Sequence, residues 1–393
     1  MKQSQFDVVL PRQHTCSVKW DNLDATFGTA DVLPMWVADM DFAAPPAVVE
    51  AIRERAAHGV YGYPIRTAEF YQAIGNWMQR RHQWAVQPEW ILNIPGVVPG
   101  ISAVIQAFTQ PGDKIIIQPP VYPPFFSCVT QSGRQVVENT LLQEGDRYVI
   151  DFDQLTQLAQ AGAKLLLLCN PHNPVGRSWT PEELRKLSQI CLEYQIILIS
   201  DEIHGDLIFK GHCHTPVASL SPEVARNTVT LTAPSKTFNI AGLNTAVAIV
   251  ADENLRKKLQ YMLEMLHISG GNLFGILALD AAYRHGEDWL VELLIYLESN
   301  ADYLVGFLAK RVPQIQVRKP ECTYLAWLDC RQLGMNVVEL KRFFTLEAKV
   351  GLNAGHAFGT AGEGFMRLNF GCSRAMLQQG LEQIEQAVNA KCR

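Results

Sequence analysis

The chain has 393 residues, of which 48% are hydrophobic and 19% charged, and it carries a net charge of −5. This length exceeds one comfortable hydrophobic core, so we expect two domains, or one large domain with a smaller one attached. The acidic balance and the lack of a basic tract argue against nucleic-acid binding. No apolar run approaches the roughly 18 residues of a membrane helix, and the first seven residues contain no apolar signal segment.

The nine cysteines are scattered along the chain and form no Cys-x-x-Cys pair. Several, such as Cys169 and Cys191, lie within apolar runs, which is typical of reduced thiols in a cytoplasmic protein. The tripeptide His212-Cys213-His214 has no second ligand group at metal spacing, so we expect no metal site there. These patterns predict a cytoplasmic protein without a membrane partner.

Short apolar runs alternate with helical periods through the middle of the chain. The runs cover residues 114–118, 165–169, 196–200, 228–232 and 245–250. This alternation predicts βα units and a mostly parallel sheet wrapped by helices. Between the second and third runs, a helix start is expected with Thr180 as the N-cap, Pro181 at the first helical position and Glu183 completing a capping box.

The pattern changes at about residue 286. A long amphipathic helix is expected from there to residue 312, followed by short strands at 324–329 and 365–369 and a terminal helix from about residue 373. A segment of this kind can form a second, smaller α+β domain.

Three polar segments follow apolar runs of the predicted sheet. The loop at 170–176 reads Asn-Pro-His-Asn-Pro-Val-Gly, Asp201 follows the next run, and a Ser-Lys-Thr turn is centred on Lys236. Loops at the carboxyl ends of parallel strands are where α/β sheets bind ligands. A lysine that forms covalent bonds needs a polar, partly desolvated turn, in which its amine can lose a proton.

These three segments, with Asp201 28 residues after Asn173 and Lys236 a further 35 residues on, resemble the fold-type I enzymes that depend on pyridoxal phosphate. The resemblance is to the class I/II aminotransferase superfamily, and within it to the MalY/PatB-type carbon–sulfur β-lyase branch that includes cystalysin. It covers nearly the whole chain. Further matching segments lie at 36–42 (Trp-Val-Ala-Asp-Met-Asp-Phe), 59–63 (Gly-Val-Tyr-Gly-Tyr), 119–122 (Pro-Pro-Val-Tyr) and 365–369 (Phe-Met-Arg-Leu-Asn).

The resemblance implies an α/β fold like that of aspartate aminotransferase. It implies a large domain with a mostly parallel sheet, which we assign to residues 48–285, and a smaller α+β domain formed by residues 1–47 and 286–393. It also implies a homodimer with the active site between the two domains and at the dimer interface.

The matched segments imply a role for each polar residue around the cofactor's ring. Lys236 would hold pyridoxal phosphate covalently and later remove the substrate's α-proton. Asp201 would pair with the ring nitrogen, Asn173 would bond the cofactor's 3′-oxygen beside the substrate, and His204 would contact that edge or Asp201. Tyr122 would stack on the ring and assist catalysis. Taken singly, each residue also has an ordinary structural alternative, such as a solvated lysine or a packed histidine.

A phosphate group needs backbone N–H donors at a helix N-terminus, together with hydroxyl groups. Gly96, Val97 and Val98 lead into an apolar helical pattern that suits such a site. Ser235 would add a hydroxyl, and the resemblance implies that Tyr63 reaches the phosphate from the neighbouring subunit.

The substrate's α-carboxylate matches the bidentate fork of Arg367, which lies in an alternating strand pattern. Ala38 would line the same pocket. For Arg367, the alternative is a structural salt bridge.

Two positions depart from the family. Asn244 replaces the arginine with which classical aminotransferases hold the phosphate, which fits the lyase branch better, and Pro123 replaces a second tyrosine of cystalysin-like sequences.

The favoured interpretation is a lyase that cleaves the Cβ–S bond of L-cystathionine or a related cysteine S-conjugate, giving a thiol such as homocysteine, pyruvate and ammonia. An aminotransferase of amino acids is the first alternative, because the same residues serve both reactions. A regulatory protein that binds a transcription activator is the second, since the MalY-type branch is known for that role.

Overall fold

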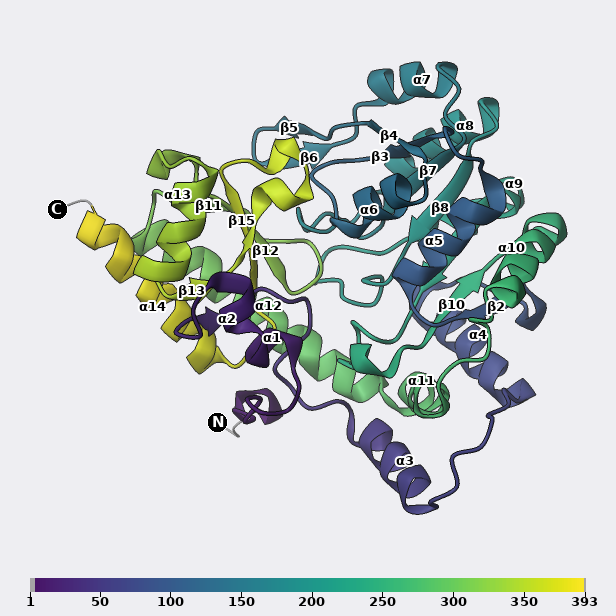
Figure 1. The fold of residues 1–393 in the computed structure, drawn as a ribbon, viewed down its shortest axis with the longest axis horizontal. Coiled ribbons are helices and arrows are strands. Elements are labelled where there is room, and N and C mark those ends of the chain that lie inside the picture. The colour runs from purple at the N-terminus through teal and green to yellow at the C-terminus, as the bar shows by residue number, and fades with distance from the viewer. Residues whose placement is uncertain (1–3, 392–393) are drawn as a thin grey trace.

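The computed structural model describes residues 4–391, so the first three residues of the predicted N-terminal segment lie outside it. Its centre is a seven-stranded sheet (Figure 1). In spatial order the strands are β2 (Ile91–Ile94), β10 (Ala246–Ile249), β9 (Thr228–Thr232), β8 (Ile197–Asp201), β7 (Leu165–Cys169), β3 (Lys114–Ile117) and β4 (Gln135–Glu138).

The sheet is mostly parallel, as the sequence predicts. The pairs from β4 through β3, β7 and β8 to β9 are parallel, whereas β10 runs antiparallel to both of its neighbours. The five strands expected from apolar runs all form. The edge strands β2 and β4 were not expected: β2 is a four-residue stretch interrupted by the polar Asn93, and β4 has only half-buried or exposed residues.

Alternate strand residues point to opposite faces of this sheet. Ile115 and Ile117 pack with α5 (Val97–Phe108), α6 (Pro124–Gln131) and α10 (Glu253–Met265). Ile116 packs on the other face with α7 (Phe152–Gln160) and α8 (Pro181–Glu193). Burial on both faces explains why these strands read as continuous apolar runs.

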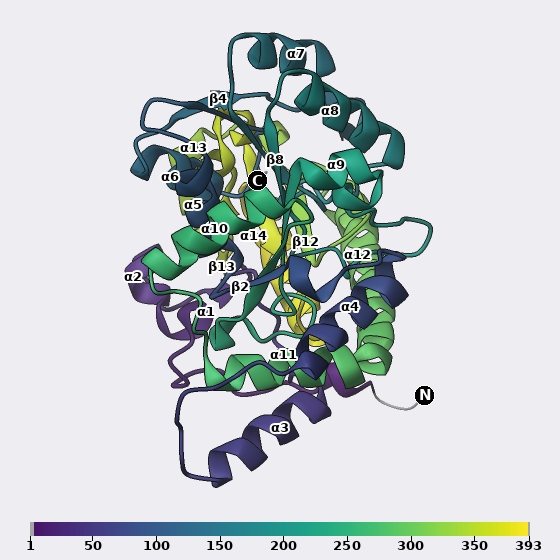
Figure 2. The same ribbon diagram turned by 90° about the vertical axis from the view of Figure 1, so that its right-hand side faces the viewer.

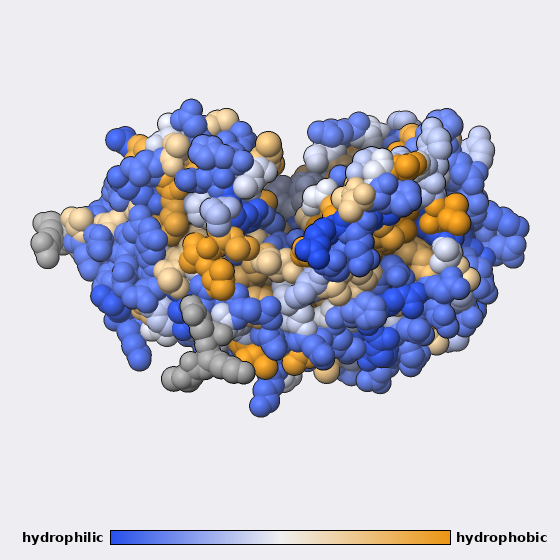
Figure 3. All heavy atoms as spheres, turned by 90° about the horizontal axis from the view of Figure 1, so that it is seen from below, coloured by the Kyte–Doolittle hydropathy of each residue, from blue (hydrophilic) through white to orange (hydrophobic). Residues whose placement is uncertain are grey.

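A second region surrounds the long helix α12 (Glu287–Arg311) and an antiparallel sheet. That sheet has the order β11 (Gln316–Val317), β12 (Leu325–Asp329), β15 (Phe365–Asn369) and β14 (Asn353–Ala354). The chain continues after it into α14 (Arg374–Lys391). Figure 3 shows the molecule hollowed between two lobes.

The N-terminal segment lies beside the C-terminal part of the chain. Strand β1 (Leu33–Pro34) pairs in parallel with β13 (Val350–Gly351), and Phe6 packs edge-on against Trp289 with ring centroids 5.5 Å apart. This arrangement agrees with an N-terminal arm that joins the smaller domain. The exact boundaries at residues 48 and 285 stay a prediction.

The remaining elements lie around this core. They are α1 (Val18–Asp21), α2 (Leu23–Phe27), α3 (Pro46–Ala57), α4 (Ala68–His82), α9 (Pro222–Arg226), α11 (Leu273–His285), α13 (Val337–Arg342) and the hairpin of β5 (Leu142–Glu144) with β6 (Arg147–Val149). Helix α3 and the extended segment after it stand out from the body (Figures 1 and 2). Within residues 4–391, no helix combines the length and apolar character needed to cross a membrane.

The predicted capping box forms at the start of α8. The Thr180 hydroxyl accepts a hydrogen bond from the Glu183 N–H at 3.2 Å, and the Glu183 carboxylate accepts one from the Thr180 N–H at 2.8 Å. The same carboxylate pairs with the buried Arg177 at 2.8 Å. Arg177 lies four residues after Asn173, so this helix start stabilises the loop that carries Asn173.

Replacing Thr180 with Ala should lower the free energy of unfolding by about 1 kcal/mol, because the Glu183 N–H loses its acceptor. Thr180→Ser keeps the hydroxyl and should remain close to the wild type. Urea unfolding of the two variants beside the wild type measures the difference. Equal losses in both variants would contradict a role for the capping hydroxyl.

Candidate active site

A cavity of about 340 Å³ lies at the carboxyl ends of the central strands, where α/β sheets bind ligands. Its lining brings together segments that are far apart in the sequence. The predicted site residues that line it are Ala38, Gly96, Val97, Val98, Tyr122, Asn173, Asp201, His204, Ser235 and Lys236. Arg367 adjoins this set through its hydrogen bond to Asn173.

Lys236 lies in the turn that follows β9. Its Nζ donates a hydrogen bond to the Ala38 carbonyl oxygen at 2.5 Å. The pKa of Lys236 is lowered to about 8, mainly by burial and also by the charge of Arg367, while Asp39 and Asp201 act in the opposite direction. A lysine with this pKa exists partly as the neutral amine near neutral pH, which is the form that attacks a carbonyl carbon.

Asp201 is the last residue of β8 and is 5% exposed. Its carboxylate accepts a hydrogen bond from the Ile203 N–H at 3.1 Å. The pKa of Asp201 is raised to about 7, mainly by burial and also by Glu202, although the Ile203 hydrogen bond and Lys236 oppose the shift. A cation at short range would stabilise the ionised form of a buried carboxylate whose pKa is raised in this way.

His204 lies near the same end of β8 and is 3% exposed. The pKa of His204 is lowered to about 3, mainly by burial and also by the charges of Lys236 and Arg367. Its imidazole is therefore neutral, and its buried Nδ1 has no hydrogen-bond partner among residues 4–391. A neutral ring with a free nitrogen can bond a ligand placed in the cavity.

Arg367 projects from β15 on the face opposite to Met366 and Leu368, as the alternating pattern predicts. The Arg367 guanidinium donates to the Asn173 Oδ1 at 3.1 Å and to the Asn353 Oδ1 at 2.7 Å. These acceptors are neutral, and the buried Nε has no partner in the described part of the chain. The predicted alternative, a structural salt bridge, is absent within residues 4–391, so the cation can receive a carboxylate.

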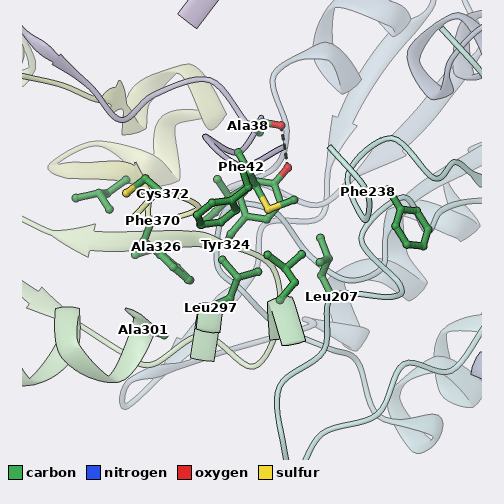
Figure 4. Packing of buried hydrophobic residues seen from close by; sticks show 14 of the residues in the cluster. Ala38, Phe42, Leu207, Phe238, Leu297, Ala301, Tyr324, Ala326, Phe370 and Cys372 are labelled. Carbon is green, nitrogen blue, oxygen red and sulfur yellow. Dashed lines mark hydrogen bonds between the residues drawn. The ribbon is translucent and has the colours of Figure 1, made fainter. Parts of the chain in front are cut away.

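The segment at 36–42 is held over Lys236 by side chains to which the sequence analysis gave no role. The Tyr324 hydroxyl donates to the Ala38 carbonyl oxygen at 2.9 Å (Figure 4). Asn369 Nδ2 donates to the Val37 and Asp39 carbonyl oxygens. Asn239 Nδ2 bonds the Met40 and Phe42 carbonyl oxygens at 2.9 and 2.7 Å. Both asparagines lie in or next to segments that carry the family resemblance. This position in the sequence could have pointed to their roles.

The N-terminus of α5 faces the cavity. Gly96 is its N-cap residue and supplies no side chain, so the first backbone N–H groups of the helix lack a side-chain cap. Ser235 and Asn244 line the cavity with Val97 and Val98. Free amides at a helix N-terminus together with a hydroxyl suit a phosphate group.

The two predicted tyrosines lie in different surroundings. Tyr122 lines the cavity, and burial raises the pKa of its hydroxyl, which keeps the ring neutral. Tyr63 is fully exposed and does not line the cavity of its own chain. Its predicted contact with a neighbouring subunit therefore stays a prediction.

The residues present fit pyridoxal phosphate and an amino-acid substrate. The acid Asp201, the arginine Arg367 and the N-terminus of α5 each have free bonding capacity for a charge of the opposite sign. Together they match a protonated ring nitrogen, an α-carboxylate and a phosphate. Among the described residues no group of three potential metal ligands forms, so the site has no ready-made metal centre there.

Comparisons with known proteins agree with this geometry. The chain is 47% identical over 385 residues to "Cystathionine beta-lyase PatB" of Bacillus subtilis (strain 168), with 98% of this chain and all of the relative covered. It is also similar to the crystal structure of cystalysin from Treponema denticola, which contains a pyridoxal 5′-phosphate cofactor, with a TM-score of 0.95, 35% identity, and coverage of 98% and 99%.

The PLP-bound C–S lyase from Staphylococcus hominis matches with a TM-score of 0.92 and 32% identity, covering 98% of each chain. These similarities confirm the aspartate aminotransferase-like fold expected from the sequence. The family "Aminotransferase class I and II" matches residues 30–384. The chain therefore belongs to the aminotransferase class I and II family.

Proposed function

We propose that this chain is a pyridoxal-phosphate-dependent lyase that cleaves the Cβ–S bond of L-cystathionine or a related cysteine S-conjugate. The observation that carries the proposal is the common cavity of Lys236 and Asp201, with Arg367 bonded to Asn173 at its wall. These groups supply an amine, an acid and a carboxylate-binding cation around one space. The similarity to proteins named as cystathionine and C–S lyases supports elimination as the reaction.

The chain's own residues would bind the cofactor at several points. Lys236 Nζ would hold it covalently, Asp201 would keep its ring nitrogen protonated, and Asn173 would donate to its 3′-oxygen. Tyr122 would cover a ring face, and the amides at the start of α5 would bond the phosphate. When bound, pyridoxal phosphate supplies an electron-poor ring that stabilises negative charge at the substrate's Cα.

Substrate chemistry then depends on orientation and proton transfer. Arg367 would hold the substrate's α-carboxylate, so that the Cα–H bond faces Lys236. The substrate's amino group would replace the Lys236 amine in its covalent bond, and the freed Lys236 amine would take the α-proton. The Cβ–S bond would then break, with its electron pair leaving on sulfur as a thiolate. The remaining three-carbon unit would react with water to give pyruvate and ammonia.

An aminotransferase is the alternative supported by a specific observation, since the matched family carries that name. Both reactions begin with the same proton transfer, and they differ in whether the β-substituent leaves.

We further propose a cytoplasmic homodimer, in which the exposed Tyr63 segment contacts the partner subunit's cofactor site. The contiguous exposed side chains of Val60, Tyr61, Tyr63 and Ile65 support such a contact, because a lone soluble chain gains nothing by exposing them.

Purified enzyme loaded with pyridoxal phosphate should release pyruvate and homocysteine from L-cystathionine in equal amounts, without an added keto acid. Lys236→Ala should lower this turnover by about 10³-fold or more, because it removes both the attachment point and the base. Pyruvate and free thiol are assayed in the same sample. Turnover that requires a keto acid and yields no thiol would instead establish the aminotransferase alternative.

The pKa of Asp201 predicts a pH-dependent stability in the cofactor-free protein. Because its folded pKa is raised to about 7, the stabilisation from the neutral acid is complete below about pH 4 and is lost as the pH rises through about 7. Asp201→Asn cannot ionise. Above pH 8 this variant should therefore exceed the wild type in free energy of unfolding by on the order of 4 kcal/mol more than it does at pH 4.

Denaturant unfolding at pH 4 to 9 measures this difference, and adding pyridoxal phosphate should reduce it, because the ring cation pairs with the ionised acid. A difference between the two proteins that stays constant with pH would refute the proposed state of Asp201.

Mixed dimers test the proposed role of Tyr63. If Tyr63 serves the partner's site, combining Tyr63→Ala chains with Lys236→Ala chains places both defects in one site and leaves the other intact. Random reassortment of equal amounts should then restore about a quarter of the wild-type sites. Activity of the mixture that equals the average of the two separate variants would show that Tyr63 acts within its own chain or not at all.

A further inference from the structure

A buried carboxylate lies behind the cavity, and the proposed reaction does not use it. Asp206 is 7% exposed and follows Asp201 by five residues. Trp77 Nε1 donates to its two oxygens at 3.1 and 3.2 Å, and His82 Nε2 lies 2.9 Å from its Oδ1. The third side-chain donor is the hydroxyl of Thr237, which lies 2.9 Å from the Asp206 Oδ2.

The contact with Thr237 connects Asp206 to the reactive lysine, because Thr237 is the next residue after Lys236. Thr237 is completely buried, so its side chain points into the protein while the lysine reaches the cavity. Its other neighbour, Phe238, packs edge-on against Trp77 with ring centroids 5.5 Å apart. Phe238 follows Thr237 in the sequence and Leu207 follows Asp206, and Figure 4 shows both within the packed interior.

The turn that carries the lysine is therefore held by two contacts, one on the interior side and one on the side of the cavity. Inside, Thr237 is bonded to Asp206; outside, Asn239 bonds the backbone of the segment whose Ala38 carbonyl accepts the Lys236 amine. A long, flexible lysine side chain gains a defined direction only when its backbone and its tip are both fixed.

Electrostatics maintain Asp206 as an anion. Burial opposes its ionisation, but the hydrogen bond and charge of His82, the charge of Arg81 and the bond from Thr237 outweigh burial and lower the pKa of Asp206. Tyr283, which stacks on Trp77 at 5.1 Å, is the other titratable group that faces it. An ionised carboxylate accepts stronger hydrogen bonds than a neutral amide, so the charge of Asp206 strengthens its hydrogen bond with Thr237.

We propose that Asp206 is a positioning residue for Lys236, acting through the Thr237 hydroxyl, and that His82 and Trp77 orient its carboxylate for this purpose. The proposal rests on the proposed role of Lys236 as the residue that attaches the cofactor. It assigns to four residues outside the cavity, Asp206, Thr237, His82 and Trp77, an effect on the geometry of the covalent link and of the proton transfer.

The test compares Thr237→Val, which removes the hydroxyl at nearly constant shape, with Thr237→Ser, which retains it. Asp206→Asn, which removes the charge, is the third variant. All are studied loaded with pyridoxal phosphate. The readouts are the pH titration of the cofactor's visible absorbance, kcat and KM separately, and the temperature of unfolding.

Thr237→Val and Asp206→Asn should shift the midpoint of the absorbance titration by at least about half a pH unit and lower kcat about tenfold, with KM within about twofold of the wild type. Thr237→Ser should recover both values. The absorbance titration needs no substrate, so it tests the proposal even if elimination is not the reaction of this enzyme.

The proposal is overturned if Thr237→Val lowers the temperature of unfolding but keeps the wild-type titration and kcat, because the hydroxyl would then serve stability alone. Equal effects of the Val and Ser variants would overturn it as well, since the hydroxyl could not be the cause. If Asp206→Asn fails to fold, the Val and Ser pair still decides the outcome.

Discussion

Incomplete pairing of buried charges is the constraint on which the site depends. Asp201, Lys236 and Arg367 share a desolvated space, yet among residues 4–391 none of them forms a salt bridge. Burial alone shifts the pKa of each group toward its neutral form. Such a site is costly while it is empty, and it gains stability from a ligand that brings a cation to the acid and carboxylates or phosphate to the donors.

Groups in this state must be held rigidly, because a small rotation would let them pair with one another or with solvent. Neutral donors and acceptors hold the groups next to the cavity: Asn353 and Asn173 on Arg367, and Tyr324 and Asn369 on the backbone at 36–42. The segment 36–42 is also held by ion pairs of Arg12 with Asp39 and Asp41 and of Lys19 with Asp41, at 2.6 to 2.7 Å. Neutral partners fix direction without cancelling charge. The ionised groups of this support, Asp206 and the ion pairs of Arg12 and Lys19, do not line the cavity, so they can hold its walls without pairing with the charges inside it.

The sequence could predict those parts of the fold and of the site that are marked by a pattern within a short stretch of residues. Apolar runs predicted the five inner strands, Asp201 was found because it follows such a run, and Lys236 was found from its Ser-Lys-Thr turn. The supporting contacts had no such signal: Thr237 meets Asp206 across 31 residues, and Tyr324 meets Ala38 across 286. Contacts at these separations depend on how the chain packs, and no spacing in the sequence encodes them.

Asn244 stands at the position where the resemblance to classical aminotransferases leads us to expect a phosphate-binding arginine. Asn244 still lines the cavity, and its left-handed backbone (φ 46°) suits asparagine, but it brings no charge. A phosphate dianion there would be met by the dipole and free amides of α5 and by neutral hydroxyls, each weaker than a guanidinium. Retention of the cofactor would then depend more on the covalent bond to Lys236 and on Asp201, so a shift in the lysine's orientation should loosen the cofactor as well as slow the reaction.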